Sequence, residues 1–338
     1  MAMKRCLLAI VCVGLLMAGC GASYDGELIW KFKTKKTCRQ WAALDAQRLF
    51  LCSDDVYCLE KATGRLLWEF KTFGPHSSAP VIEGGRLFLQ CGGLYALDPA
   101  TGDVLWEFWV TGWAKVSPVV SGGRVYAPIG RRLYCLDTAS GQRLWSIKTG
   151  ILEKAPVLIG DRLFFSVDTK IVCLDVSRRQ VVWDFDVGSD SMNLASGGDY
   201  LLSVDPAGLV RAHQVENGQV QWQFETNMSG KLVGFSKVPD GKMLVRAGVL
   251  YCLNPESGLS LWTFTQDHLP VTGLHVFGQH ILVKVGQNQL LYISILNGKV
   301  VSRLRLPRGG LLVTAGSDSA FLAGNRSREV FGLSVPVL

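Results

Sequence analysis

Short apolar runs that alternate with polar residues recur along the chain, and each ends in a turn motif followed by a tryptophan. The clearest copy, residues 94–108, reads Leu-Tyr-Ala-Leu-Asp-Pro-Ala-Thr-Gly-Asp-Val-Leu-Trp-Glu-Phe. A period of two on both sides of Asp-x-x-Thr-Gly predicts a β-hairpin, in which the Asp side chain caps the turn and glycine supplies a positive φ. The chain is therefore predicted to consist of short strands joined by tight turns.

The spacing of the tryptophan that follows each turn gives the length of the repeat. It falls at Trp30, Trp68, Trp106, Trp145, Trp183, Trp222 and Trp262, with Ser302 in the eighth place. The intervals are 38, 38, 39, 38, 39, 40 and 40 residues. A period near 40 built from short strands is typical of a β-propeller with one four-stranded sheet per repeat. A flat indole suits the wedge between neighbouring blades, so the seven tryptophans are interpreted as structural docking residues.

The two ends of the chain supply complementary parts of one repeat. The segment around Trp30 is a lone fourth strand, whereas three strands are expected around Leu311–Val313, Ala320–Leu322 and Val330–Leu333, with no fourth strand after them. Pairing the two ends removes two exposed strand edges. We therefore expect an all-β, eight-bladed propeller of four-stranded blades, formed as a single domain by residues 25–338 and closed by the N-terminal strand.

Residues 1–19 have the pattern of a bacterial lipoprotein signal peptide. A basic pair, Lys4-Arg5, precedes an apolar run and Met17-Ala-Gly-Cys20, which resembles a lipobox. The pattern predicts cleavage before Cys20, lipid on Cys20, and a short tether over residues 20–24. An ordinary signal peptide cut near Ala18 is the alternative. Gly21, where Asp would favour retention in the inner membrane, favours the periplasmic side of the outer membrane in a Gram-negative cell.

The net charge argues against one class of function, and the cysteine positions predict the state of the thiols. Lys4 and Arg5 account for two of the seven net positive charges, so +5 remains after cleavage. That excess is too small and too dispersed for nucleic-acid binding. Four cysteines occupy one repeat position on different blades, which predicts buried free thiols rather than disulfides; they are Cys58, Cys135, Cys173 and Cys252.

Ring closure would gather basic residues that lie far apart in the sequence. This candidate basic edge consists of Lys31, Lys33, Lys35, Lys36, Arg303, Arg305, Arg308, Arg326 and Arg328, and the same blade carries four acidic residues, Asp25, Glu27, Asp318 and Glu329. It is either an ordinary solvated edge or a surface that rests on anionic lipid headgroups next to the Cys20 tether.

Loops from the outermost strand of one blade to the first strand of the next emerge on one side of a propeller. They carry aromatic, aliphatic and methionine side chains, a composition expected of a protein-binding face. The candidate partner face consists of Phe73, His76, Trp113, Lys115, Ile151, Leu152, Met192, Leu194 and Met228. The alternative is that these side chains fold inward and fill the central channel.

The motif Ala-x-Asp-x-x-Thr-Gly-x-x-x-Trp, from Ala96 to Trp106, resembles the tryptophan-docking repeat of pyrroloquinoline quinone (PQQ) enzymes and their non-enzymatic relatives. Among these, a lipid-anchored propeller without a second domain is most similar to the BamB-type family of the outer-membrane β-barrel assembly machinery. The resemblance implies a non-catalytic scaffold, a monomeric disc that binds envelope proteins within a complex, with no cofactor. The chain lacks the Arg-, Leu- and Asp-containing loop of that family, so no partner-contact residue is transferred.

Two other functions remain open. A PQQ-dependent dehydrogenase of this fold would need a vicinal cysteine pair and insertions around the cofactor, and the chain has neither. A propeller that binds polysaccharide or another envelope ligand is excluded by no sequence feature. The five histidines show no metal-site or catalytic-triad spacing, so no catalytic or metal-binding residue is assigned.

Overall fold

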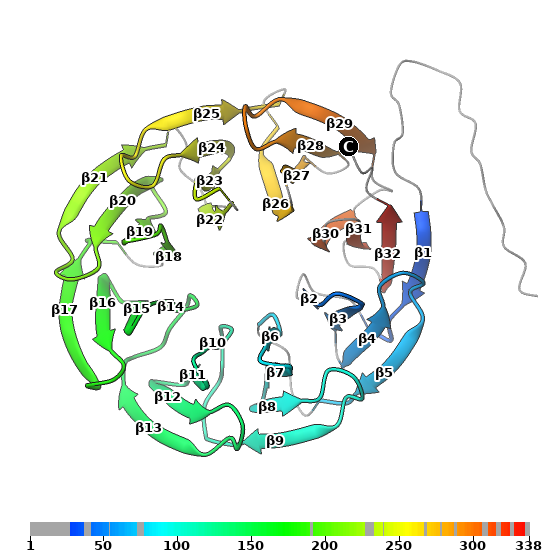
Figure 1. Cartoon of the computed structure of the whole chain (residues 1–338), viewed down its shortest axis with the longest axis horizontal. Coiled ribbons are helices and arrows are strands. Elements are labelled where there is room, and N and C mark those ends of the chain that lie inside the picture. Colours follow the sequence, from blue (N-terminus) through cyan, green and yellow to red (C-terminus); the bar gives the residue numbers. More distant parts are fainter. Residues whose placement is uncertain are drawn as a thin grey trace, which may run out of the picture.

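The computed structural model describes residues 28–36, 42–53, 55–72, 78–189, 192–226, 233–238, 240–266, 269–277, 279–286, 289–305, 310–315, 319–324 and 328–334. The predicted signal peptide, the tether and Cys20 lie outside these residues. The described strands form eight four-stranded antiparallel sheets, and Figure 1 shows them arranged as a ring. The described part of the chain contains no helix, and hence none long and apolar enough to cross a membrane.

Each sheet runs from an innermost strand to an outermost strand in chain order, except in the sheet that closes the ring. The innermost strands are β2 (Ala42–Leu44), β6 (Val81–Glu83), β10 (Val119–Ser121), β14 (Val157–Ile159), β18 (Asn193–Ser196), β22 (Val233–Lys237), β26 (Val271–Phe277) and β30 (Gly310–Ala315). The second strands are β3 (Arg48–Cys52), β7 (Arg86–Cys91), β11 (Arg124–Ile129), β15 (Arg162–Val167), β19 (Tyr200–Val204), β23 (Met243–Ala247), β27 (His280–Val285) and β31 (Ser319–Gly324).

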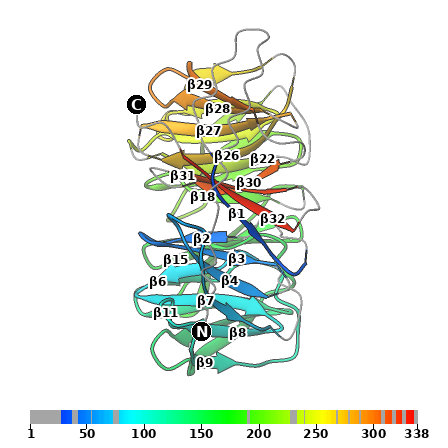
Figure 2. The ribbon, with the colours of Figure 1, turned by 90° about the vertical axis from the view of Figure 1, so that its right-hand side faces the viewer.

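The remaining strands complete the blades toward the circumference of the disc, which Figure 2 shows from its edge. The third strands are β4 (Val56–Glu60), β8 (Gly93–Leu97), β12 (Arg132–Asp137), β16 (Lys170–Asp175), β20 (Leu209–Gln214), β24 (Val249–Leu253), β28 (Gln289–Ser294) and β32 (Glu329–Ser334). The outermost strands are β1 (Leu28–Lys33), β5 (Leu66–Phe70), β9 (Val104–Phe108), β13 (Arg143–Lys148), β17 (Gln180–Asp186), β21 (Val220–Glu225), β25 (Ser260–Phe264) and β29 (Val300–Arg305).

The core lies between the faces of neighbouring sheets. In β3, Leu49 and Leu51 pack with Trp30 of the preceding sheet, whereas Phe50 points the other way and packs with Leu87 of the following sheet. Successive side chains of a strand point to opposite faces, so a blade that is covered on both sides needs apolar residues at every position. This explains why the second and third strands of the repeats read as continuous apolar runs.

The predicted ring closure is confirmed by the pairing of β1 with β32. Leu28 registers with Leu333 and Lys33 with Glu329, and the sheet order is β1-β32-β31-β30. The two strands come from opposite ends of the chain, so the outermost strand of this sheet is its first strand in sequence. The three C-terminal strands occupy the expected places and extend beyond the core residues that the sequence indicated.

The tryptophans join each sheet to the next. The Trp30 indole donates from Nε1 to Lys61 O at 2.9 Å and lies against Gly64, where an added Cβ would come within 2.4 Å of the ring. Gly64 has φ +68°, so glycine is needed both for the turn and for the close approach. The same bond joins Trp68 to Pro99 O, Trp106 to Thr138 O, Trp183 to Val215 O, Trp222 to Pro255 O and Trp262 to Ile295 O, at 2.8–3.1 Å.

The residue opposite each docking tryptophan is small. Cys58 registers with Trp68, Ala96 with Trp106, and Gly332 with Trp30. This requirement explains the repeated cysteines, which are buried and free among the described residues, as predicted. Burial raises the pKa of the Cys58 thiol to about 12, which makes it a poor nucleophile at neutral pH.

Two repeats depart from this pattern. Opposite Ser302, in the eighth place, lies Tyr292, a large and buried side chain. The blade that faces Ser302 is the closing blade, in which β32 and β1 are not joined by a turn, so there is no turn glycine for an indole to cover. In the other departure Arg179 replaces the turn glycine next to Trp145 and adopts φ +61°.

Candidate partner-binding face

One face of the ring is formed by the loops between blades together with the turns between second and third strands. Backbone hydrogen bonds hold these two sets of segments together. Gly130 N donates to Trp113 O at 3.0 Å, and Thr149 N donates to Arg131 O at 3.1 Å. Gly112 approaches Gly130 so closely that an added Cβ would lie 3.0 Å from the Gly130 Cα. The loops are therefore fixed in position by the blade beneath them.

Three large apolar side chains are exposed on this face of the described structure between β9 and β14. Trp113 is 73% exposed, Trp109 48% and Ile151 40%. Trp109 packs edge-to-face on Tyr95, with ring centroids 5.6 Å apart. Exposed indoles on fixed loops are typical of protein-binding surfaces. The sequence indicated Trp113 and Ile151; Trp109 was missed because it follows directly on a strand.

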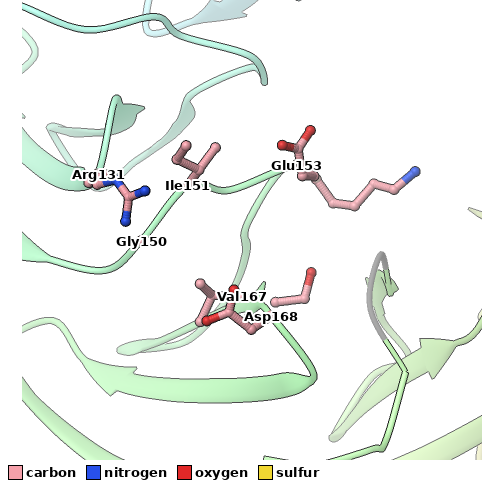
Figure 3. A pocket seen from close by; sticks show the side chains of 8 residues that line it. Arg131, Gly150, Ile151, Glu153, Val167 and Asp168 are labelled. Atoms are coloured by element: carbon pink, nitrogen blue, oxygen red, sulfur yellow. The ribbon is translucent and has the colours of Figure 1, made fainter.

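A cavity of about 590 Å³ opens beside Ile151. Figure 3 shows Ile151 and Glu153 on one side of it and Val167 and Asp168 on the other, with Arg131 nearby. Its lining also includes Gly150, Lys154 and Ser166. Asp168 has φ +51° at a turn position where the preceding blade has Gly130 with φ +60°. Asp adopts this conformation at turns more readily than most non-glycine residues, so the tight turn between β15 and β16 accounts for it.

The cavity carries charges of both signs. Glu153, in the lining, forms an ion pair with Lys115, which is not a lining residue. Arg131 and Asp168, both exposed, form no ion pair with another residue in the described part of the chain. The surface around Trp113 and Ile151 therefore combines apolar area with charged groups that are available to a ligand, the mixture found at the centre and rim of protein interfaces.

Several predicted members of the partner face point inward instead. Leu152 is 3% exposed and Met192 is fully buried, each within a core cluster, and Leu194 is half-buried against the same cluster as Met192. For these three residues the alternative, that the side chains are core, is correct, because loop residues turn toward whichever side offers apolar contacts. Phe73, His76 and Met228 lie outside the described residues. The exposed face is therefore reduced to Trp113, Lys115 and Ile151, with Trp109 added.

The candidate basic edge is placed on and next to β1. Lys31, Lys33, Lys35, Lys36, Arg303 and Arg328 are exposed. Lys31 pairs with Glu329 (Nζ–Oε1 2.7 Å) and lies over the Phe331 ring, and Lys35 pairs with Glu69. Arg305 is the last residue of β29, and Arg308 and Arg326 lie outside the described residues.

The structure contains one serine–histidine pair that the sequence did not indicate. Ser203 Oγ and His213 Nε2 are 2.8 Å apart, and His213 Nδ1 lies 3.2 Å from Gly218 O. Both side chains have no solvent-exposed surface, and burial lowers the pKa of His213 to about 4. A substrate cannot reach this pair, which therefore has a structural role. Among the described residues no group of three His, Cys, Asp or Glu side chains is arranged to hold a metal ion.

Comparison with known proteins gives a family. A family model described as "Outer membrane protein assembly factor BamB" matches residues 21–203 and 206–327. No match was found among curated protein sequences. The crystal structure of BamB from Moraxella catarrhalis is similar with a TM-score of 0.70 at 17% identity, over 92% of this chain and all of that one.

Two further solved structures share the fold. The computationally designed protein Ika8 has a TM-score of 0.77 at 12% identity, over 90% of this chain and 98% of that one. The quinohemoprotein alcohol dehydrogenase ADHIIG from Pseudomonas putida HK5 has a TM-score of 0.71 at 11% identity, over 92% of this chain and 76% of that one. Identities this low show the fold alone. The family model, in contrast, matches most of the chain, and the protein therefore belongs to the family of outer membrane protein assembly factor BamB.

Proposed function

We propose that the protein is a non-catalytic scaffold that takes part in assembling outer-membrane β-barrel proteins and binds a protein partner with the face around Trp113. Family membership supports a role in this assembly process, since the family description names outer membrane protein assembly. The observation that carries the binding face is the exposure of Trp113, at 73%, on a loop whose backbone is bonded to the turn beneath it. A fixed indole loses little side-chain entropy on binding, which favours it as an interface anchor.

The lipobox-like motif that ends at Cys20 supports a proposed location. We propose that Cys20 is lipidated and holds the protein on the periplasmic side of the outer membrane, where the β-barrel assembly machinery is the expected partner. A monomeric disc within that complex needs no catalytic group or cofactor. Growth with labelled palmitate, followed by comparison of the wild-type protein with Cys20→Ala, tests the anchor: label that persists in the variant contradicts it.

The binding face is tested by site-specific photo-crosslinking in living cells. A photoreactive amino acid at position 113 is expected to give crosslinks to a component of the β-barrel assembly machinery. Ser121 is the matched control, because it is exposed and lies in the same blade at the opposite end of β10. Crosslinks from position 121 but none from position 113 would place the interface on the other face, and crosslinks only to proteins outside the machinery would reject the proposed process.

A quinoprotein oxidoreductase is the second candidate, supported by the likeness to the quinohemoprotein dehydrogenase. This likeness covers 76% of that enzyme, so the comparison does not span its whole length. Incubation of the purified protein with PQQ and calcium, followed by dye reduction with alcohols, tests this function. Turnover that depends on PQQ would show that the protein is an oxidoreductase and would contradict the proposed scaffold function.

A further inference from the structure

We propose that the edge of the disc formed by β1 and the start of β32, together with Arg303 on β29, is a membrane-contact surface that binds the anionic headgroups of a phospholipid bilayer. This surface, the basic rim, comprises Lys31, Lys33, Lys35, Lys36, Arg303 and Arg328, all of them exposed. The inference rests in part on the proposed lipid anchor, but its test does not require the lipid.

The basic rim is an arrangement that only the closed ring produces. Lys31 and Lys33 are two residues apart on β1 and therefore lie on the same face of the strand. Thr34 N donates to Arg328 O at 2.7 Å, which fixes Arg328 beside the end of β1 although the two residues lie almost 300 positions apart. Arg303 is on β29, the outermost strand of the neighbouring sheet and therefore the next outermost strand around the ring from β1 (Figure 1).

Acidic residues neutralise only part of this charge. Glu329 pairs with Lys31, and Glu69 pairs with Lys35. Lys33, Arg303 and Arg328 form no ion pair in the described part of the chain. The sequence adds a second asymmetry, since residues 268–317 contain five Lys or Arg side chains and no Asp or Glu. Several cations on one rim, with few carboxylates to compensate them, favour a polyanionic surface as the binding partner.

The position of the tether favours a lipid bilayer over other polyanionic binding partners. β1 begins at Leu28, eight residues after Cys20. Eight extended residues reach at most about 28 Å. A lipid on Cys20 would therefore hold this rim, and not the opposite side of the ring, close to the headgroups. The anchor and the cations would act on the same edge, as membrane proteins with one lipid anchor commonly combine it with a basic patch.

Such a contact would orient the disc. The edge formed by β1 and β32 faces the reader in Figure 2. A disc held by its rim stands upright on the membrane. Trp113 lies in the loop between β9 and β10, in blades that do not include β1 or β32, so it is then left accessible to a partner in the periplasm.

Vesicle binding by unlipidated protein tests the proposal. Every described strand lies between residues 28 and 334, so protein that begins at residue 21 keeps all eight sheets. Sedimentation with vesicles of phosphatidylethanolamine and phosphatidylglycerol is compared with vesicles of phosphatidylcholine alone. Binding is expected to the anionic vesicles and to fall strongly between 50 mM and 300 mM salt, because exposed charges are screened at about 10 Å or less at 0.1 M salt and above.

Two triple variants locate the surface. Lys33→Gln, Arg303→Gln and Arg328→Gln together are expected to weaken partitioning onto anionic vesicles by about tenfold or more. The control combines Arg143→Gln, Lys148→Gln and Lys237→Gln, three exposed cations elsewhere on the disc, and is expected to bind like the wild type. Equal loss in both variants, no loss in the rim variant, or no binding to anionic vesicles would overturn the proposal. Crosslinking at position 113 tests the proposed function separately and is unaffected by these outcomes.

Discussion

Tyr292 and Ser302 lie opposite each other on β28 and β29, where other blades pair a small residue with a docking tryptophan. In this blade the third strand carries the large side chain and the outermost strand carries the small one, which is the reverse of the arrangement in the other blades. The reversal occurs at the blade that faces the ring closure, where no turn glycine exists for an indole to cover. Blade packing and ring closure are thus linked through this pair.

We expect Ser302→Trp to destabilise the protein by about 1–3 kcal/mol, because the new indole competes with Tyr292 for one space. Adding Tyr292→Ala is expected to recover part of this loss, and urea denaturation of both single variants and the double variant measures the coupling. Strictly additive effects would show that the two side chains do not share a space.

Arg179→Gly is expected to raise the free energy of unfolding by about 0.5–1 kcal/mol, since Arg179 holds a left-handed conformation that glycine adopts without strain. Thermal unfolding measures the effect. Gly141→Ala is the matched control in the preceding blade; there a Cβ would lie 2.6 Å from the Trp106 ring, so the substitution should lower the melting temperature. A stabilising Gly141→Ala would contradict this account of the turn.

Ring closure predicts a large effect of Trp30→Ala. Trp30 is 7% exposed and bonds the closing blade to the first blade, so its loss should cost about 3–5 kcal/mol. Deletion of residues 25–34 removes β1 altogether and is expected to leave an aggregation-prone or unfolded protein, whereas deletion up to Tyr24 should be harmless. Cooperative melting at the original temperature without residues 25–34 would show that β1 is dispensable.

Leu152 and Trp113 should separate stability from binding. Leu152→Ala removes a core side chain and is expected to cost about 2–4 kcal/mol, while Trp113→Ala should leave the melting temperature almost unchanged and reduce partner crosslinking or capture. Calorimetry and pull-down from membranes measure the two effects. Large destabilisation by Trp113→Ala would mean that its indole is part of the fold.

The buried histidine predicts a pH dependence. Because burial lowers the pKa of His213 in the folded protein to about 4, while the unfolded chain takes up a proton near pH 6.5, the stability that this group contributes above pH 6.5 is lost as the pH falls toward 4. In six other blades leucine occupies the register position of His213, so His213→Leu with Ser203→Ala should fold and show a smaller loss between pH 7 and pH 4.5. His275, whose pKa burial also lowers to about 4, leaves a residual dependence. Identical urea midpoints against pH in variant and wild type would contradict this assignment.

The periodic parts of the chain were predictable, and the irregular parts were not. Trp106, Gly102 and Ala96 recur at fixed spacing because one packing arrangement is repeated, so the sequence alone indicates their role. The loops have no period, and the inward orientation of Leu152 and Met192 depends on pockets made by other blades. The pairing of Ser203 with His213 likewise joins two strands at positions where other blades have apolar residues, so no spacing rule indicates it.

The pairing of β1 with β32 also determines the order in which the protein can fold. In a chain that emerges with its N-terminus first, β1 appears at the start and β32 at the end, about 300 residues later. Until then β1 has no partner in its sheet, and Trp30 has only the first blade to pack against. Contacts between such distant segments form slowly because a very long loop must close first. The contact between β1 and β32 is therefore the last of the ring that can form as the chain emerges, and until it forms the edge of β1 is exposed.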